Sequence, residues 1–156
     1  EVTERPVNAI APHAQAKGAR VLSGQRLLVI EDELLVALEV VATLEDAGAK
    51  VTGPLGSVEQ AAEIIENDTF DAVLLDGNLH GRPVDELAGL LTRRKMPFIF
   101  VTGYGRESLP RGFDTVAILK KPFTQAQLIE AVAALLIQSR EIIPLRIEPQ
   151  PIPGTA

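Results

Sequence analysis

The middle of the chain alternates short apolar runs with longer stretches in which apolar residues recur at helical spacing. The apolar runs are four to six residues long, and continuous runs of this length predict strands that are buried on both faces. The second run is the weakest, because it contains a glycine and a proline. The five predicted strands span residues 27–30, 50–55, 71–75, 97–101 and 115–119.

Four of the intervening stretches have the spacing of amphipathic helices. Two of them open with a capping box, in which a hydroxyl side chain and a glutamine three residues later satisfy free backbone N–H groups; these boxes begin at Ser57 and Thr124. Gly48 is placed to end the first helix. The positions predicted to face the core are Leu34, Leu38, Val41 and Leu44, then Ala61, Ile64 and Ile65, then Leu87, Leu90 and Leu91, and finally Leu128, Val132, Leu135 and Leu136.

Strand and helix alternate five times with short connections. This order predicts an α/β fold: a doubly wound, five-stranded parallel sheet with right-handed crossovers and helices on both faces. Residues 106–114 have few apolar positions, so any helix there is expected to be short. We expect residues 1–24 to be a flexible arm or linker, residues 25–139 to be the domain, and residues 140–156 to be a Pro-rich tail whose segment 142–147 pairs with a sheet edge or a partner chain.

Composition and charge narrow the class of protein. The chain has 156 residues, a net charge of −6 and no cysteine, so it has no basic footprint for nucleic acid and no thiolate chemistry. Two distant histidines do not suggest a zinc site. No apolar run reaches the length of a membrane span, and the first residues lack the order of a signal peptide. We expect a cytoplasmic protein that does not contact membranes.

Polar residues stand at the ends of four of the predicted strands. Glu31 and Asp32 follow the first strand, Asp76 ends the third, Thr102 follows the fourth, and Lys121 lies shortly after the fifth. In a doubly wound sheet the carboxyl ends of the strands converge on one crevice. Carboxylates gathered there would suit Mg²⁺, while a lysine and a hydroxyl would suit a phosphoryl group. An aspartate so placed could attack phosphorus and become an aspartyl phosphate.

These segments together resemble the signature of response-regulator receiver domains. The resemblance covers residues 26–138 and implies a flavodoxin-like sheet with strand order 2-1-3-4-5. It rests on four motifs in the right order: Ile-Glu-Asp-Glu at 30–33, Leu-Leu-Asp at 74–76, Val-Thr-Gly at 101–103 and Leu-Lys-Lys-Pro-Phe at 119–123.

The resemblance also implies a role for each residue. Asp76 would be the phosphoacceptor. Asp32 would bind Mg²⁺ directly, Glu31 would act through water, and the backbone carbonyl of Asn78 would be a further ligand. Thr102 would donate a hydrogen bond to the incoming phosphoryl group, Lys121 would contact it, and the bond from Lys121 to Pro122 would be cis. His80, close to Asp76 in the sequence, is expected to be an exposed loop residue.

One position departs from the usual pattern. Receivers commonly carry a switch aromatic three residues before the lysine, and this chain has Ile118 there. The segment 100–104 instead resembles a branch with a Phe-Ala-Thr-Gly-x-Tyr motif, although Val101 replaces the alanine and Tyr104 comes one place early. We therefore expect residues 103–114 to form the switch.

The expected function is that of a phosphoacceptor receiver, not a metabolic enzyme. A histidine kinase or phosphotransfer protein would supply the phosphoryl group, and output would pass to a downstream protein. A stand-alone regulator, the C-terminal receiver of a hybrid kinase, and a homodimer built through the last helix and tail all remain open. Two alternatives are a haloacid-dehalogenase-type phosphatase, disfavoured because Asn78 stands where its general acid would be, and a pseudo-receiver that works without phosphorylation.

Overall fold

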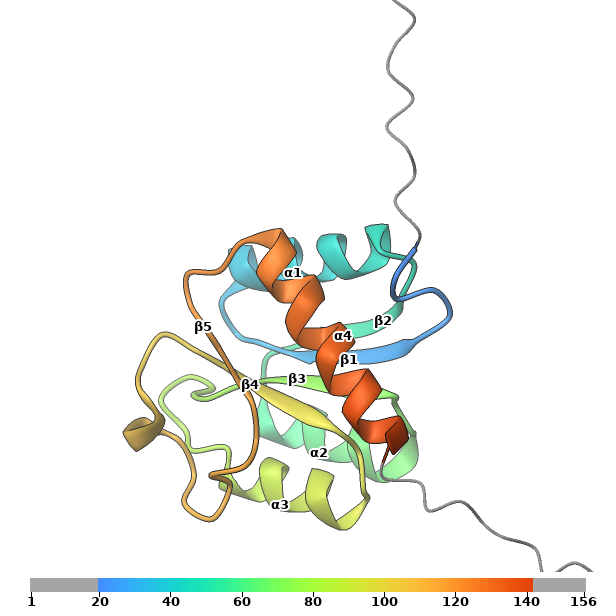
Figure 1. The fold of residues 1–156 in the computed structure, drawn as a ribbon. Coiled ribbons are helices and arrows are strands. Elements are labelled where there is room, and N and C mark those ends of the chain that lie inside the picture. The colour runs from blue at the N-terminus through green and yellow to red at the C-terminus, as the bar shows by residue number, and fades with distance from the viewer. Residues whose placement is uncertain (1–19, 142–156) are drawn as a thin grey trace, which may run out of the picture.

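A computed structural model describes residues 20–141, which form one parallel sheet with helices on both faces (Figure 1). The strand order is β2-β1-β3-β4-β5, and all four pairings are parallel, which confirms the predicted fold class. The strands are β1 (Arg26–Ile30), β2 (Lys50–Leu55), β3 (Ala72–Asp76), β4 (Phe98–Thr102) and β5 (Ile118–Lys120).

The helices cover the sheet in pairs: α1 and α4 pack on one face, and α2 and α3 on the other (Figure 1). None of the helices in the described part is long and apolar enough to cross a membrane. The predicted capping box at Thr124 is complete, because the Thr124 side chain accepts the N–H of Gln127 and the Gln127 side chain accepts the N–H of Thr124. At Ser57 only one half is formed among the described residues, in which the serine side chain accepts the N–H of Gln60. The helices are α1 (Leu34–Asp46), α2 (Val58–Asn67), α3 (Asp85–Arg93) and α4 (Gln125–Glu141).

The two central strands explain why the apolar runs are continuous. Every residue of β3 and β4 is buried, and successive residues serve opposite faces of the sheet. Val73 and Leu75 pack with α2 and α3, whereas Ala72 and Leu74 pack with α1 and α4. Because β3 is the middle strand, its last residue, Asp76, is held at the centre of the carboxyl edge.

The predicted stripe on the first helix is wrong at two positions. Leu34 and Leu38 are 64% and 51% exposed, whereas Ala37, Val40 and Leu44 are buried. Apolar residues occur almost all round this helix, so spacing alone does not say which stripe faces the sheet. The stripe on the last helix is confirmed: Leu128, Val132 and Leu136 are buried, and Leu135 is partly buried.

The connection from β4 to β5 contains one short 3₁₀ turn, η1 (Arg106–Ser108), in agreement with the expectation of a short helix. The side chain of Arg106 holds this connection by donating hydrogen bonds to the carbonyl oxygens of Phe113 and Val116, at 3.3 and 3.0 Å. Leu109 is buried, and a Cβ atom added at Gly77 would lie 2.6 Å from its Cδ2 atom. The fifth strand begins only at Ile118, three residues later than predicted.

The outer parts of the chain are described only in part. The domain bounds at 25 and 139 stay a prediction, and the segment 142–147 lies outside the described residues. Leu22 is fully buried against the α1–α4 side of the core, and α4 continues through Glu141.

Candidate functional site

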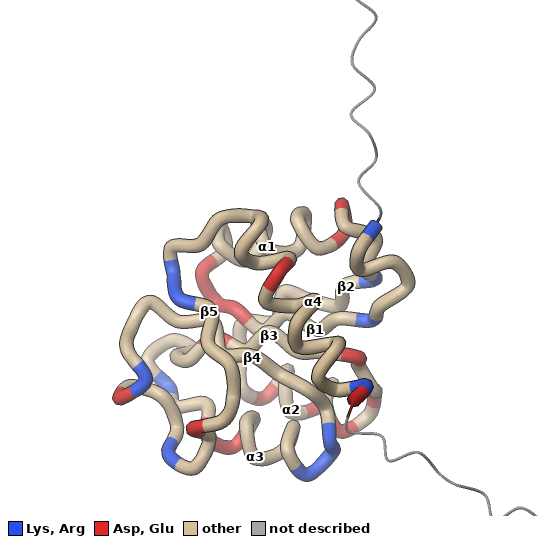
Figure 2. The backbone as a smooth tube through the Cα atoms, viewed as in Figure 1, with Lys and Arg blue, Asp and Glu red and all other residues tan. Residues whose placement is uncertain are grey.

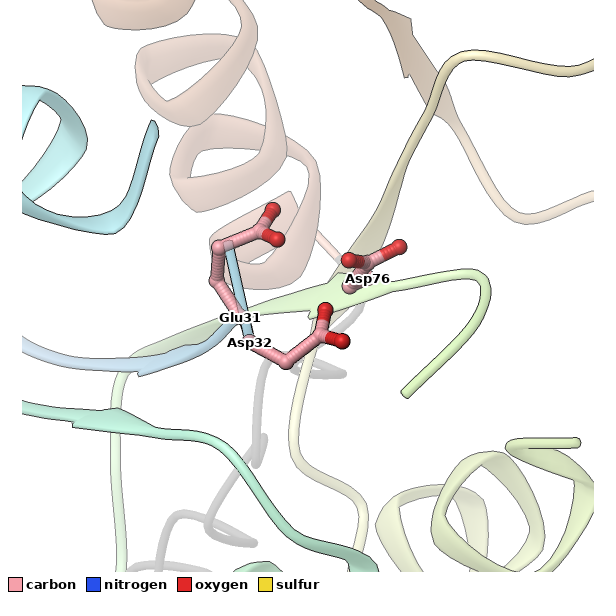
Figure 3. A group of neighbouring side chains, drawn as sticks. All are labelled: Glu31, Asp32 and Asp76. Carbon is pink, nitrogen blue, oxygen red and sulfur yellow. The ribbon is translucent and has the colours of Figure 1, made fainter. Parts of the chain in front are cut away.

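Three carboxylates meet at the carboxyl edge of the sheet. Asp76 is the last residue of β3, and Glu31 and Asp32 follow the neighbouring strand β1. One carboxylate oxygen from each lies within 4.8 Å of the others, and Figure 3 shows the three side chains around a common space. Glu31 and Asp76 are buried, and Asp32 is partly buried. Sequence order had predicted this convergence, because parallel strands bring their carboxyl ends to one edge.

Backbone N–H groups hold each of the three side chains in place. Asp76 Oδ1 accepts the N–H of Asn78 at 3.0 Å, and Glu31 Oε1 accepts the N–H of Glu33, also at 3.0 Å. Asp32 Oδ2 accepts the N–H of His80 at 2.9 Å. These hydrogen bonds join the loops after β1 and β3 to the carboxylates. The loops therefore orient the three acidic side chains, and the acidic side chains in turn hold the loops in place.

Lys121 reaches the carboxylates from the loop between β5 and α4. Its Nζ atom lies 2.8 Å from Glu31 Oε2, 3.0 Å from Glu33 Oε1 and 3.4 Å from Asp76 Oδ2. In Figure 2 the acidic stretch after β1 lies beside the basic pair at the end of β5. The peptide bond from Lys121 to Pro122 is cis, as the resemblance implied.

Burial and crowding shift the pKa values of these groups. Burial alone would lower the pKa of Lys121, but hydrogen bonds to Glu31 and Glu33 and the charge of Asp76 outweigh it and raise that pKa. Burial and the neighbouring Glu31 raise the pKa of Asp76 to about 8, although the N–H of Asn78 and the charge of Lys121 oppose this rise. Burial would also raise the pKa of Asp32, but the N–H of His80 and further hydrogen bonds together outweigh burial and lower that pKa.

The donor set of the site fits a hard divalent cation. Mg²⁺ prefers oxygen ligands and is usually held by one or two carboxylates together with several waters. A cation placed among Glu31, Asp32 and Asp76 would relieve their mutual repulsion and bring the pKa of Asp76 down again.

A groove of about 730 Å³ opens over the acids and brings in the remaining predicted residues. Asn78, Thr102 and Lys121 line this groove together with Asp32 and Asp76. Thr102 is 2% exposed, and its Oγ1 atom accepts the N–H of Tyr104 at 3.1 Å. Val36, Glu39, Tyr104 and Phe123 extend the lining away from the acids.

Sequence reasoning missed two features at this site. Glu33 is a third carboxylate partner of Lys121, and the only hint was a third consecutive acidic residue at the start of a helix. His80 is exposed, as expected, but its Nδ1 atom also lies 3.3 Å from Asp32 Oδ2. His80 has a positive φ of 50°, and its backbone N–H donates to the same Asp32 oxygen. The spacing of residues in the sequence did not indicate this turn.

Known proteins are similar to this chain in sequence and in fold. The family model for the response regulator receiver domain matches residues 27–133. The chain is 28% identical over 128 residues to the transcriptional regulatory protein PdtaR of Mycobacterium tuberculosis (strain H37Rv), covering 80% of this chain and 62% of PdtaR. The chain therefore spans somewhat less than two thirds of that relative.

Solved structures agree with the family match. The solution structure of SdrG from Sphingomonas melonis Fr1 is 35% identical, with a TM-score of 0.64, and the match covers 74% of this chain and 98% of SdrG. The receiver domain of the sensor histidine kinase PA1611 from Pseudomonas aeruginosa PAO1, solved with a magnesium ion coordinated in its active site cleft, has the same fold at 23% identity and a TM-score of 0.62, covering 73% of this chain and 98% of that one. The chain belongs to the response regulator receiver domain family, the signalling modules of two-component systems.

Proposed function

We propose that the domain accepts a phosphoryl group on Asp76 from the phosphohistidine of a histidine kinase or phosphotransfer protein, with Mg²⁺ in the site. The observation that carries this proposal is the meeting of a buried aspartate with two other carboxylates and a lysine ammonium at the carboxyl edge of the sheet, where a groove opens. With Mg²⁺ held by the carboxylates, the groove would present both the metal and the ammonium of Lys121 to an anionic phosphoryl group.

The proposed transfer assigns a part to each side chain. A carboxylate oxygen of Asp76 attacks phosphorus, the phosphorus–nitrogen bond breaks, and its electron pair stays on the imidazole of the donor. Lys121 balances the charge of the transferred oxygens, and Thr102 offers its hydroxyl as a donor. Glu31, Asp32, Asp76 and the backbone carbonyl of Asn78 would hold Mg²⁺, which supplies further neutralisation of the phosphoryl oxygens.

Exposed leucines beside the groove provide a surface for the phosphodonor protein. Leu34, Leu35 and Leu38 are 64%, 83% and 51% exposed on α1, whose first turns border the groove at Val36. Clustered apolar side chains on an otherwise polar surface mark contact sites for other proteins. We propose that a helical partner docks here and presents its histidine to Asp76.

The connection between β4 and β5 is proposed as the switch that passes the signal on to a downstream protein. Ile118 occupies the position of the usual aromatic, so the usual side-chain relay has no ring to move. The buried Leu109 of this connection lies against Gly77, directly after Asp76, and near Thr102. A change at Asp76 would therefore reach residues 103–114 through direct packing. Equal relaxation dispersion of this segment with and without a phosphoryl mimic would contradict the assignment.

The test of the proposed function is intact mass after incubation with acetyl phosphate and Mg²⁺. We expect one phosphoryl adduct on the wild-type chain and none on Asp76→Asn or in the presence of EDTA. Because rapid hydrolysis could hide an adduct, a parallel titration with beryllofluoride is followed by NMR. No adduct and no response to beryllofluoride would overturn the proposal and favour the pseudo-receiver.

A further inference from the structure

Lys121 has three carboxylate partners, and one of them, Glu33, has no part in the transfer proposed above. The contacts from Lys121 Nζ to Glu31 and Glu33 are 2.8 and 3.0 Å, and the contact to Asp76 is the longest at 3.4 Å. The ammonium group thus contacts three carboxylates at once. In the resting protein the lysine is thus held more closely by the two glutamates than by the proposed phosphoacceptor.

The backbone of Glu33 is held by hydrogen bonds, whereas its side chain is largely exposed. Its N–H donates to Glu31 Oε1, and its carbonyl oxygen accepts the N–H of Ala37 in the first turn of α1. Glu33 is the N-cap residue of α1, but its side chain makes no cap bond and reaches across to Lys121 instead. That side chain is 62% exposed, whereas the side chain of Glu31 is 4% exposed.

This difference in burial decides which contact yields when Asp76 carries a phosphoryl group. A charge-assisted bond from Lys121 to a phosphoryl oxygen is expected at about 2.7–2.9 Å, so the ammonium would shift toward Asp76. Leaving Glu31 would take a close cationic partner away from a buried carboxylate, which is costly. Leaving Glu33 would expose a carboxylate that water can solvate at once.

The geometry points to Glu33 as a positioning residue that restrains Lys121 in the resting protein and releases it when Asp76 is phosphorylated. This inference rests on the proposed function, because it assigns Glu33 a part in the same chemistry. The restraint opposes the phosphorylated state, so its loss favours that state. Ion pairs with an exposed partner are weak, and the expected effect is about two- to fivefold in affinity.

The test is the dissociation constant of beryllofluoride, measured with Mg²⁺ by NMR titration of the full chain. We expect Glu33→Gln to bind about two- to fivefold more tightly than the wild type. Glu33→Asp keeps the charge but is one methylene too short for the 3.0 Å contact, so it should bind as tightly as Glu33→Gln. Glu39→Gln removes one negative charge from the same helix and the same groove, and among the described residues Glu39 makes no ion pair with Lys121. It reports the effect of charge alone.

Repeating the Glu33→Gln substitution in a chain that already carries Lys121→Met separates the effect of the ion pair from any other structural effect of the substitution. In Lys121→Met the partner is absent, so adding Glu33→Gln should leave the affinity unchanged. Equal affinities of the wild type, Glu33→Gln and Glu39→Gln, or weaker binding by Glu33→Gln, would overturn the inference and leave the proposed function standing. Failure of the wild-type chain to bind beryllofluoride would overturn the proposed function and the inference with it.

Discussion

Replacing Asp76 by asparagine should stabilise the domain when no divalent cation is present. Asp76 is buried within 4.8 Å of two other carboxylates and 3.4 Å from one ammonium. With an effective dielectric constant of about 20, each repulsive pair costs at least about 3.5 kcal/mol and the lysine returns about 5 kcal/mol. Ionised Asp76 therefore destabilises the wild type by a net amount of about 2 kcal/mol, before the cost of burying its charge is added. Asp76→Asn removes this destabilisation.

The pH dependence of this gain follows from the direction of the pKa shift. The pKa of Asp76 is raised to about 8 in the folded protein and is about 3.9 in the unfolded chain. The folded wild type therefore binds the extra proton between these values, and its free energy of unfolding falls as the pH rises from about 4 to about 8. The advantage of Asp76→Asn should grow over the same range and then level off.

Urea unfolding followed by circular dichroism in EDTA measures this advantage at several pH values, with the slope of the transition as a check on two-state behaviour. Asp114→Asn, an exposed substitution of the same type on the β4–β5 connection, is the matched control. Saturating Mg²⁺ should remove most of the advantage, because it stabilises only the intact acid cluster. A variant no more stable than the wild type at pH 8 in EDTA, or a difference that does not change with pH, would refute the electrostatic reasoning.

Three further predictions concern the cation, the packing and the partner surface. Mg²⁺ at 100 times its dissociation constant should add about 2.7 kcal/mol to the free energy of unfolding of the wild type, and much less to that of Asp32→Asn, as thermal melts would show. Gly77→Ala would place a methyl group 2.6 Å from Leu109 and should lower the free energy of unfolding by about 1–3 kcal/mol. Leu109→Ala should lower it by about 2–4 kcal/mol. Urea titrations that found either variant as stable as the wild type would contradict this packing. Leu35→Lys should change the free energy of unfolding by less than about 0.5 kcal/mol, leave labelling by acetyl phosphate intact and slow transfer from a partner kinase at least tenfold, and equal kinase-dependent rates would rule out this surface.

Much of the site could be predicted from the sequence because it is built at strand ends. An apolar run followed by an acid fixes both the strand and the position of the side chain at its tip. Parallel topology then brings Asp32, Asp76 and Lys121 together even though they are far apart in the sequence. The same logic placed Thr102 at the end of β4.

The features that sequence reasoning missed depend on how a helix is rotated about its axis and on how far a side chain extends. Neither is determined by the order of elements along the chain. Because α1 is apolar on several sides, helical spacing alone predicts Leu34 and Leu38 in the core, and only packing against the sheet selects the stripe of Ala37 and Val40. The role of Glu33 was missed because its partner, Lys121, lies 88 residues away in the sequence. Long side chains that cross a groove leave no periodic trace in the sequence.

The unequal number of charges in the groove has a consequence for how its two ligands influence each other. The acid cluster has one ammonium, that of Lys121, and four carboxylates, those of Glu31, Asp32, Glu33 and Asp76, so with all of these groups ionised it carries three negative charges in excess. A divalent cation offsets two of these charges, whereas phosphorylation replaces the single charge of the Asp76 carboxylate by nearly two and so adds about one back. Each event thus lowers the cost of the other, and thermodynamic reciprocity requires the two effects to be equal in size. The concentration of free Mg²⁺ would then influence what fraction of the domain is phosphorylated at a given supply of donor. Phosphorylation would in turn raise the affinity of the domain for Mg²⁺ by the same factor.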